Sequence, residues 1–313
     1  MWRRRLPEQA AAALIGVVTS EAPVQSTAPE TDRRPALVLV STPIGNLGDL
    51  SPRAVAALRD ADIILCEDTR VTATLLSLNG IGTRVQPLHD HNEAGRTDPL
   101  VEAMLRGRRY ALVSDAGAPL IADPGYRLVR AAIAAGLVVS AVPGPNAAMM
   151  ALALSGLPPH PFLFMGFLPP RTVARRGVLE RIVAAERAGL NATLVFYEAP
   201  HRLVASLEDC AAVLGDRAAS VGRELTKRFE EVRRGGLSEL AETFRAVAPR
   251  GEITLVIAPA PVHVASADQL DAALEEALAE SSIKDAVAAV SRALDLPRKQ
   301  VYARALILRG DEE

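Results

Sequence analysis

The sequence predicts an α/β protein that consists of two α/β domains followed by a small helical appendix. Apolar, β-branched runs without polar alternation recur between helical patterns in the first half, as is typical of a parallel sheet with helices on both faces. After a proline-rich break at 157–161, strand and helix patterns begin again at Phe162, and beyond His263 only helical patterns remain. We therefore expect an extension, two α/β domains and an appendix with the limits 1–35, 36–150, 151–262 and 263–313.

The composition narrows the class of protein. At 313 residues, the chain is long enough for two domains with hydrophobic cores. Its formal net charge of −2 excludes an overall basic protein, so any nucleic-acid contact must come from local patches. Cys66 and Cys210 lie in hydrophobic segments, which indicates a reducing compartment such as the cytoplasm rather than a disulfide scaffold. No apolar run reaches membrane-spanning length.

Residues 1–35 begin with arginines and a short apolar stretch. Prolines and polar residues interrupt this stretch, which favours a disordered extension over a signal peptide.

The first half begins with a strand at 37–41 that leads through a turn of small residues into a helix at 51–60. Ser51 is placed to cap this helix, and Pro52 fits its first position. Gly80 and Gly136 end two later helices, as residues just past a C-terminus commonly do. Further strands are expected at 62–66, 110–114 and 138–142, with a weaker one at 84–88, and further helices at 69–79, 94–106 and 126–135.

The second half follows an Ala-rich helix within 143–161. Its strands are expected at 162–167, 193–198, 218–224 and 252–258, and its helices at 171–188, 201–213 and 237–247. The appendix contains helical patterns at 267–280, 283–294 and 297–308.

Four loops rich in glycine, proline and acidic residues follow the strands of the first half. They are TPIGN (42–46), EDTR (67–70), SDAGAPLIADPG (114–125) and PGPNAA (143–148). Because the carboxyl ends of parallel strands meet at one edge of a sheet, we expect these loops to converge on a ligand. The first loop matches neither G-x-G-x-x-G nor G-x-x-x-x-G-K-[ST], so it does not indicate a dinucleotide or a triphosphate.

Two aspartates of the third loop receive different interpretations. Asp115 directly follows a strand and precedes small residues, which suits a cationic or hydroxyl-bearing ligand that approaches the backbone closely. The alternative for Asp115 is an Asx turn that caps its own loop. Asp123 precedes Pro124 and Gly125, and we expect it to shape the turn and to cap the next helix.

The chain resembles the tetrapyrrole methylase superfamily over about residues 36 to 260. Eight motifs in order carry the resemblance: TPIGNLGDLSPRA, EDTR, SDAGAPLIADPG, PGPNAAMMALALSGLP, FMGFLP, FYEAPHR, RELTKRFEE and GEITLVI. Within the superfamily, it is most similar to the enzymes that methylate the ribose 2′-oxygen of a decoding-region cytidine in 16S ribosomal RNA. The resemblance implies a class III methyltransferase fold with S-adenosylmethionine in a cleft between two α/β domains. It also implies the small ribosomal subunit as partner, a homodimer and a cytoplasmic location.

The resemblance implies a set of cofactor contacts in both domains. Small residues would allow close approach of the cofactor, Asp115 would meet its amino-acid or ribose part, and three residues of the second domain would close over its adenine. For those last three residues, ordinary core packing is the alternative. The set consists of Pro43, Gly45, Asp115, Ala118, Asn146, Ala147, Leu225, Ile253 and Thr254.

Alignment of the reacting atoms supplies much of the rate of methyl transfer. A ribose hydroxyl loses its proton in the reaction, so a nearby base, or a cation that stabilises the developing alkoxide, would accelerate it further. Glu198 and His201, in FYEAPHR, are candidate bases. Lys227, in RELTK, is a candidate for stabilising negative charge. The alternatives are that Glu198 pairs with Arg202 and that RELTKRFEEVRR (223–234) is a solvated charged segment.

Residues suited to RNA lie in several segments. The expected substrate contacts are Asp68, Arg70, Asn92, Glu93, Arg202, Arg223, Arg298 and Lys299. Asn92 and Glu93 belong to HDHNE (89–93), a predicted loop whose two histidines lack the neighbours of a metal site, so no metal is expected.

Two segments concentrate positive charge. The helix 171–188 begins with Arg171, Arg175 and Arg176. The segment 282–309 resembles a helix-turn-helix, with Arg298, Lys299 and Tyr302 at the start of its second helix. We expect this appendix to dock RNA, and a dimerisation or lid element is the alternative.

Other functions fit less well. A tetrapyrrole-precursor C-methyltransferase would share the fold, but its first loop is typically G-x-G-P-G rather than TPIGN, and it has no need of a basic helical appendix. A relative that modifies an elongation-factor histidine differs from SDAGAP and PGPNAA. A non-catalytic ribosome-assembly factor that keeps the pocket is the alternative from another class.

Overall fold

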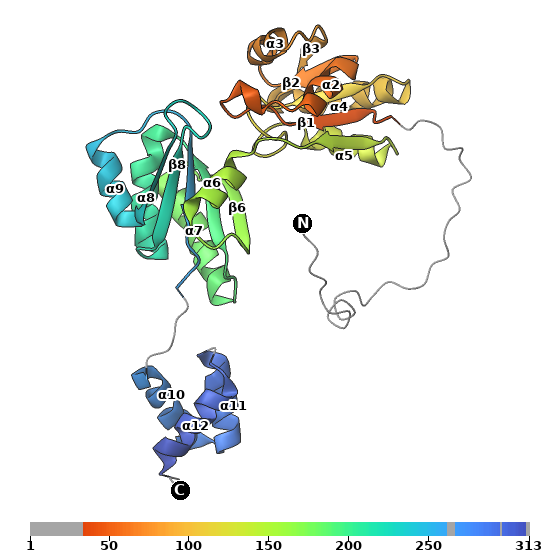
Figure 1. The fold of residues 1–313 in the computed structure, drawn as a ribbon. Coiled ribbons are helices and arrows are strands. Elements are labelled where there is room, and N and C mark those ends of the chain that lie inside the picture. The colour runs from red at the N-terminus through yellow and green to blue at the C-terminus, as the bar shows by residue number, and fades with distance from the viewer. Residues whose placement is uncertain (1–33, 262–266, 295, 311–313) are drawn as a thin grey trace, which may run out of the picture.

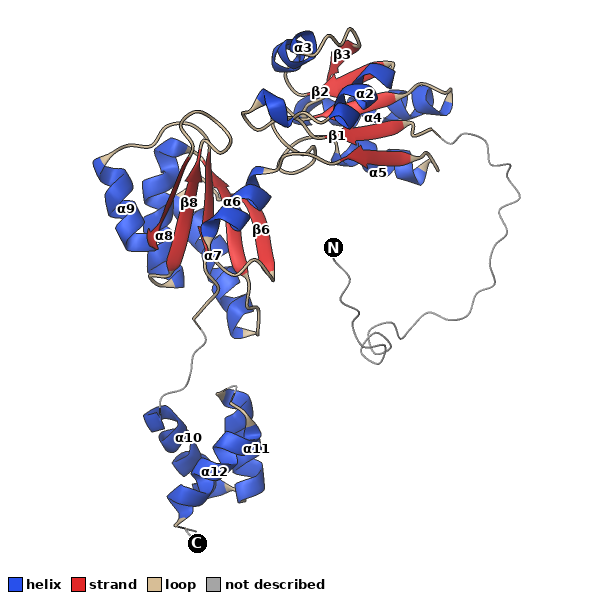
Figure 2. Cartoon of the chain, viewed as in Figure 1, coloured by secondary structure: helices blue, strands red, loops and turns tan. Residues whose placement is uncertain are grey.

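The computed structural model describes residues 34–261, 267–294 and 296–310. Within them, two separate five-stranded sheets each carry their own helices, and a group of three further helices ends the chain (Figures 1 and 2). The predicted α/β class with a helical appendix is confirmed. The expected N-terminal extension lies almost wholly outside the described residues.

The first sheet is entirely parallel, with the strand order β3-β2-β4-β1-β5. Its strands are β1 (Leu37–Val40), β2 (Ile63–Cys66), β3 (Arg84–Pro87), β4 (Tyr110–Val113) and β5 (Val139–Val142). A short 3₁₀ turn, η1 (Leu47–Asp49), follows β1. All five strands lie within one residue of the predicted ranges. Strands β2 and β4 are buried along their whole length, as continuous apolar runs predict, whereas β3 and β5 are only partly buried.

Helices cover both faces of this sheet. Helices α2 (Pro52–Asp60) and α3 (Thr69–Leu78) pack on one face, where Leu58 and Leu76 meet Ile64. Helices α4 (Asp90–Leu105) and α5 (Tyr126–Ala134) pack on the other, where Leu100 and Leu128 meet Leu65. Ser51 caps α2 as predicted, accepting a hydrogen bond from the Ala54 N–H at 3.1 Å.

The second sheet is mixed, with the order β6-β7-β10-β8-β9. The pair β6–β7 is parallel and the other three pairs are antiparallel. The strands are β6 (Phe162–Phe167), β7 (Thr193–Glu198), β8 (Ala218–Arg223), β9 (Glu231–Gly236) and β10 (Ile253–Ile257). The sequence did not indicate a strand within 223–234, whereas β9 begins there and pairs with β8 along its whole length; Arg233 and Arg234 are nevertheless exposed, as the interpretation of a solvated segment expected. The charged side chains of β9 do not give the apolar pattern by which strands are predicted, and such side chains are typical of a sheet edge.

Helices also cover both faces of the second sheet. Helices α7 (Thr172–Arg187), α8 (Leu203–Leu214) and α9 (Leu237–Ala246) bury Leu179, Leu207 and Leu240 against one face, and a 3₁₀ turn, η2 (Pro200–Arg202), precedes α8. Helix α6 (Ala147–Ser155) packs on the other face, beside Ile44 of the first loop. This contact joins the two halves of the chain.

The last three helices have a hydrophobic core of their own. They are α10 (Ala267–Glu280), α11 (Ile283–Ala293) and α12 (Arg298–Arg309). Leu274, Val290 and Val301 are buried where the three helices meet. The three helical patterns of the appendix are thus confirmed.

Both cysteines are free and buried, as their hydrophobic settings predicted. Burial raises the pKa of the Cys210 thiol to about 12, so this side chain acts as a small apolar core residue.

Candidate active site

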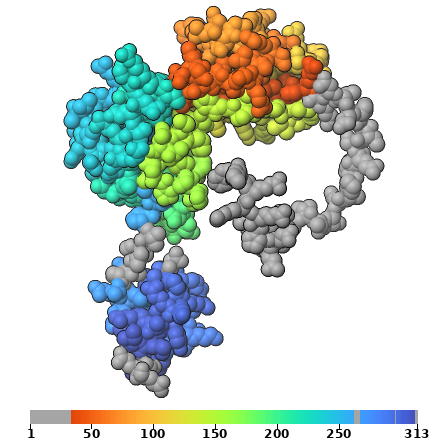
Figure 3. Space-filling view, viewed as in Figure 1, coloured from red at the N-terminus to blue at the C-terminus, as the bar shows by residue number. Residues whose placement is uncertain are grey.

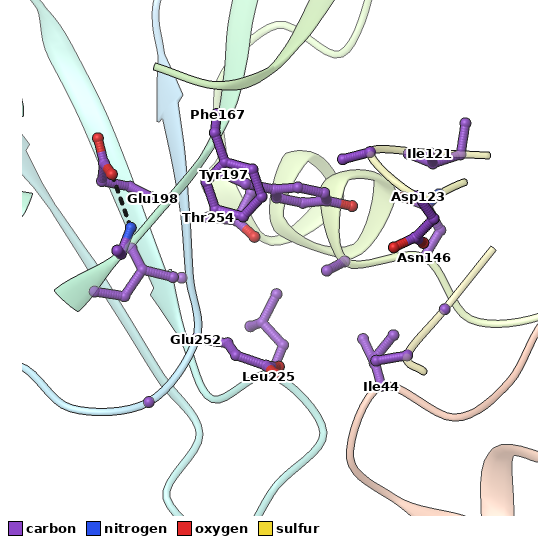
Figure 4. A pocket seen from close by; sticks show the side chains of 18 of the residues that line it. Ile44, Ile121, Asp123, Asn146, Phe167, Tyr197, Glu198, Leu225, Glu252 and Thr254 are labelled. Carbon is purple, nitrogen blue, oxygen red and sulfur yellow. Dashed lines mark hydrogen bonds between the residues drawn. The ribbon is translucent and has the colours of Figure 1, made fainter. Parts of the chain in front are cut away.

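A cavity of about 400 Å³ lies between the loops of the first sheet and the strand ends of the second (Figure 4). Its volume is in the range of small-molecule and cofactor sites. Residues from both halves line it, and they include seven of the nine predicted cofactor contacts: Asp115, Ala118, Asn146, Ala147, Leu225, Ile253 and Thr254.

The loop after β4 forms the first wall. Thr42 and Gly117 exchange backbone hydrogen bonds of 2.9 and 3.1 Å, which ties this loop to the one after β1. Leu120 and Ala122 adopt φ values of 72° and 68°, a region that is unfavourable for residues other than glycine. Strain of this kind is typical of functional loops that the surrounding structure holds in place.

Asp115 joins the third loop to the second. Its Oδ1 accepts a hydrogen bond of 3.1 Å from the Asp68 N–H, so the carboxylate bridges two loops rather than capping its own. Asp68 in turn caps α3 by accepting from the Arg70 N–H at 2.8 Å. The convergence of these loops at the sheet edge agrees with the prediction from parallel topology.

Asp123 also lines the cavity, although the sequence indicated only a turn-forming role. Burial raises the pKa of this carboxyl to about 6, and the charges of Glu67 and Asp115 add to the effect, while a hydrogen bond from Ser114 opposes it. The predicted helix cap is wrong: Gly125 is the N-cap residue of α5 and makes no side-chain cap bond.

The second sheet contributes apolar and aromatic side chains. Tyr197 lies edge-on to Phe164, with ring centroids 4.9 Å apart, and the ring centroids of Tyr197 and Phe167 are 5.6 Å apart. Tyr197 and Phe167 line the cavity opposite Asn146, and neither was predicted (Figure 4). Leu225 and Thr254 are buried in the core and also line the cavity, so the core interpretation is confirmed for them and contact with a cofactor stays a prediction.

Glu198 is buried at the cavity wall with both carboxylate oxygens engaged. Oε1 lies 2.6 Å from the Arg202 guanidinium and 2.8 Å from the Ala199 N–H, and Oε2 accepts from the Ser206 hydroxyl at 2.5 Å. The pairing with Arg202 that the sequence left open is therefore present. His201 is exposed and does not line the cavity.

The two halves of the chain are in contact (Figure 3), and Lys227 lies at such a contact, where its stem meets Gly45 of the loop after β1. Its Nζ is 2.8 Å from Glu224 and 3.0 Å from Glu252, and Glu252 lines the cavity. Burial lowers the pKa of the ammonium, but the hydrogen bonds to both carboxylates outweigh burial and raise it overall. The amine therefore stays protonated and suits a cationic role rather than that of a base.

The loop after β1 meets this lysine. The Asn46 N–H donates to Thr226 Oγ1 at 3.2 Å, and a Cβ added to Gly45 would collide with Cγ of Lys227. Gly45 and Pro43 are not among the lining residues, whereas Ile44 between them is. The small residue at position 45 is thus explained by the lysine stem rather than by a ligand.

Three predicted substrate contacts have other roles in the structure. Glu93 is 4% exposed, and its Oε1 accepts from the Leu128 N–H at 3.1 Å, so it caps α5 from within and the prediction of a substrate contact is wrong. Asn92 accepts from the His89 N–H at 3.0 Å at the start of α4. Arg70 forms an exposed ion pair with Asp68 at 2.6 Å.

The segment HDHNE is therefore not a loop. It forms the N-cap and first turn of α4, which begins four residues before the predicted start, because the Asn92 side chain closes the turn. Among the described residues, no group of three or more His, Cys, Asp or Glu side chains is placed to hold a metal ion.

Of the three arginines at the start of α7, Arg175 is buried, whereas Arg171 and Arg176 are exposed. Arg175 is 2% exposed and lies 2.5 Å from Asp209, and Arg176 lies 2.7 Å from the other oxygen of the same carboxylate. The expectation of an RNA-binding group at this helix start is wrong for Arg175, because a buried guanidinium needs a buried partner. By contrast, Arg298, Lys299 and Tyr302 are exposed on the first turns of α12.

Comparisons with known proteins agree with this architecture. Residues 36–241 match the family described as Tetrapyrrole (Corrin/Porphyrin) Methylases, and residues 264–309 match the RsmI C-terminal HTH domain. A "Ribosomal RNA small subunit methyltransferase I" of Mesorhizobium japonicum is 43% identical over 91% of this chain and 96% of its own. Another of that name, from Micromonospora olivasterospora, is 45% identical over 85% of each chain. The crystal structure of the methyltransferase CobJ shares the fold at 20% identity, with a TM-score of 0.54 over 72% of this chain and 95% of its own.

Proposed function

Because the chain belongs to the tetrapyrrole methylase family, we propose that it transfers a methyl group from S-adenosylmethionine to ribosomal RNA of the small ribosomal subunit. The acceptor that we propose is the ribose 2′-oxygen of a cytidine in the decoding region of 16S ribosomal RNA. One observation carries the proposal: the motif loops of both halves enclose a single cavity that is large enough for a cofactor.

The chemistry of the cavity wall fits this cofactor. When bound, S-adenosylmethionine supplies a methyl carbon on a positively charged sulfur, which is a good leaving group. Asp115 and Asp123 offer carboxylates to the positive charges of such a molecule, and Ile44, Phe167 and Leu225 offer apolar surface to its adenine. The cavity therefore combines acidic and apolar walls, as a cationic nucleoside requires.

The acceptor oxygen must enter from the rim, since the deep wall would be covered by the cofactor. Lys227 lies at that rim as a permanent cation, and we assign it to the negative charge that develops on the ribose oxygen. Glu198 is engaged by Arg202 and Ser206, so we assign it to holding FYEAPHR in place. His201 remains the candidate base, because it is exposed near the same strand end.

The experiment that tests the function follows the methyl group. The full chain is incubated with S-adenosylmethionine labelled in the methyl group and with small subunits that lack the modification. We expect label in the RNA, and specifically in a dinucleotide that resists alkali, because a 2′-O-methyl group blocks cleavage at the adjacent phosphate.

Other products of the same reaction separate the competing functions. Label in a tetrapyrrole precursor and none in RNA would identify a C-methyltransferase. Tight binding to small subunits without any transfer would identify an assembly factor, and both outcomes contradict the proposal.

We further propose that the appendix, residues 263–313, docks RNA, while residues 36–150 and 151–262 enclose the cofactor. The exposed cations Arg298 and Lys299 on α12 support this division.

No helix among the described residues has the length and apolar character needed to cross a membrane. Action on ribosomal subunits implies a cytoplasmic location.

We also propose that the protein acts as a homodimer. Strand β6 is an edge strand, and its residues Phe162, Met165 and Phe167 are exposed, as are Met149 and Met150 on α6. An exposed apolar edge strand is a common pairing surface. Light scattering of the purified chain should give twice the chain mass, and a monomer at micromolar concentration would contradict the proposal.

A further inference from the structure

A smaller cavity of about 160 Å³ lies on the face of the second sheet that α9 covers, at the same sheet end as the candidate active site. Gly222 and Gly251 line the larger cavity, while the residues next to them in the chain, Arg223 and Arg250, line the smaller one. The two cavities therefore lie at the same end of the second sheet but on opposite faces, because successive residues of a strand point to opposite sides. Gly222 faces α6, whereas Arg223 lines the smaller cavity together with Phe244 of α9. We call the smaller one, which is lined by Arg223, Arg233, Arg250 and Glu231, the arginine pocket.

The arginine pocket carries a net positive charge. Glu231 lies 3.1 Å from Arg223 Nε and 2.5 Å from Arg233 Nε, so one carboxylate holds two guanidinium groups. Arg250 has no ion-pair partner among the described residues, and its side chain is exposed. Three cations thus face a single anion.

The backbone and an aromatic ring keep the pocket in shape. The Arg250 carbonyl accepts a hydrogen bond of 3.3 Å from Arg223, which joins the loop after α9 to the end of β8. The Arg233 guanidinium lies 5.7 Å from the ring centroid of Phe244, which forms part of the floor. Two of the three arginines are held by partners, and the third remains available to a ligand.

We propose that the arginine pocket binds a backbone phosphate of the RNA whose ribose is presented to the larger cavity. This inference rests on the proposed function. A phosphate is the anion that guanidinium groups bind best, through paired charge-assisted hydrogen bonds. An RNA chain carries a phosphate at every nucleotide, and the structure places a cationic pocket at the same end of the second sheet as the cavity at which a ribose would react. The contact would position the nucleotide without reading its base.

The test compares Arg250→Glu, Arg250→Lys and the wild type, with Arg181→Glu as the matched control. Arg181 is an exposed arginine of α7 that lines neither cavity. For Arg250→Glu we expect the KM for unmodified small subunits to rise about tenfold or more, while kcat and the affinity for S-adenosylmethionine change less than about twofold. Arg250→Lys should restore most of the affinity, because a point charge still binds phosphate.

A binding measurement makes the test independent of methyl transfer. Fluorescence anisotropy with a short labelled single-stranded RNA should show weaker binding by Arg250→Glu, and the dependence of log K on log salt should become less steep by about 1. An unchanged KM and an unchanged RNA affinity in Arg250→Glu, or equal losses in Arg181→Glu, would overturn the arginine pocket as a phosphate site. If the wild type transfers no methyl group to RNA, the proposed function fails, and the anisotropy result then decides separately whether the pocket binds RNA.

Discussion

At the scale of single residues, Asp123 is the group whose ionisation is most clearly altered within the cavity. Its pKa lies at about 6 because of burial first and of the carboxylates of Glu67, Asp115 and Asp90 next, and a cationic ligand would favour its charged form. We expect the affinity for S-adenosylmethionine to fall several-fold between pH 7.5 and pH 5.5. Asp123→Asn should bind more weakly at pH 7.5 and lose most of this dependence. Titration calorimetry measures both, with Asp98→Asn, an exposed site on α4, as the control. A pH profile shared by the wild type and Asp123→Asn would contradict this role.

The same pKa shift has a consequence for stability without a ligand. The folded-state value of about 6 is higher than the usual 3.8, so the folded state binds a proton more tightly than the unfolded state does. The resulting stabilisation is present below about pH 4 and is lost as the pH rises through 6. Asp123→Asn should therefore be more stable than the wild type by about 1 kcal/mol at pH 8, after allowance for solvent screening. Thermal unfolding at pH 4.5 and pH 8 checks this, and an equal difference at both pH values would refute it.

The residues of the site were predictable to different degrees. Asp115, Asn146 and Ala147 follow parallel strands, and topology alone brings such residues to one edge. Phe167 and Tyr197 were missed, because an aromatic residue at the end of an apolar strand has the pattern of a core residue. Arg175 was misassigned for the opposite reason, since its buried partner Asp209 lies more than thirty positions away in the sequence.

At the scale of elements, the contact between the loop after β1 and the loop after β8 sets the position of Lys227. Lys227→Met keeps the stem that packs on Gly45 but removes the ammonium, so we expect kcat to fall about 100-fold with little change in cofactor affinity. Gly45→Ala should also lower kcat, because its Cβ would displace the lysine stem. Single-turnover transfer to small subunits measures the rate, and calorimetry measures the affinity. A kcat within twofold of the wild type in Lys227→Met would remove this lysine from the chemistry.

Helices and strands were predicted best where their own residues are apolar and buried. Strands β2 and β4 are buried along their whole length, and the sequence located them and the other three strands of the first sheet to within one residue. Strand β9 was missed because its side chains are charged and its hydrogen bonds come from β8, a partner that no local pattern reveals. The start of α4 was placed too late, since its first turn is closed by Asn92 and its Glu93 is occupied with another helix.

At the scale of the whole molecule, the cavity and the appendix separate two tasks, and α12 allows them to be tested apart. The appendix has its own core, so surface charges on α12 can be changed without disturbing the cavity. We expect Arg298→Glu with Lys299→Glu to raise the KM for small subunits by about tenfold or more, while the affinity for S-adenosylmethionine stays unchanged. Arg309→Glu, an exposed residue in the last turn of the same helix, is the control for charge alone. If only the first turn matters, α12 presents its N-terminal end to RNA. Equal effects at both ends would instead indicate nonspecific attraction, and no effect at either end would leave RNA docking to the arginine pocket and the rim of the cavity.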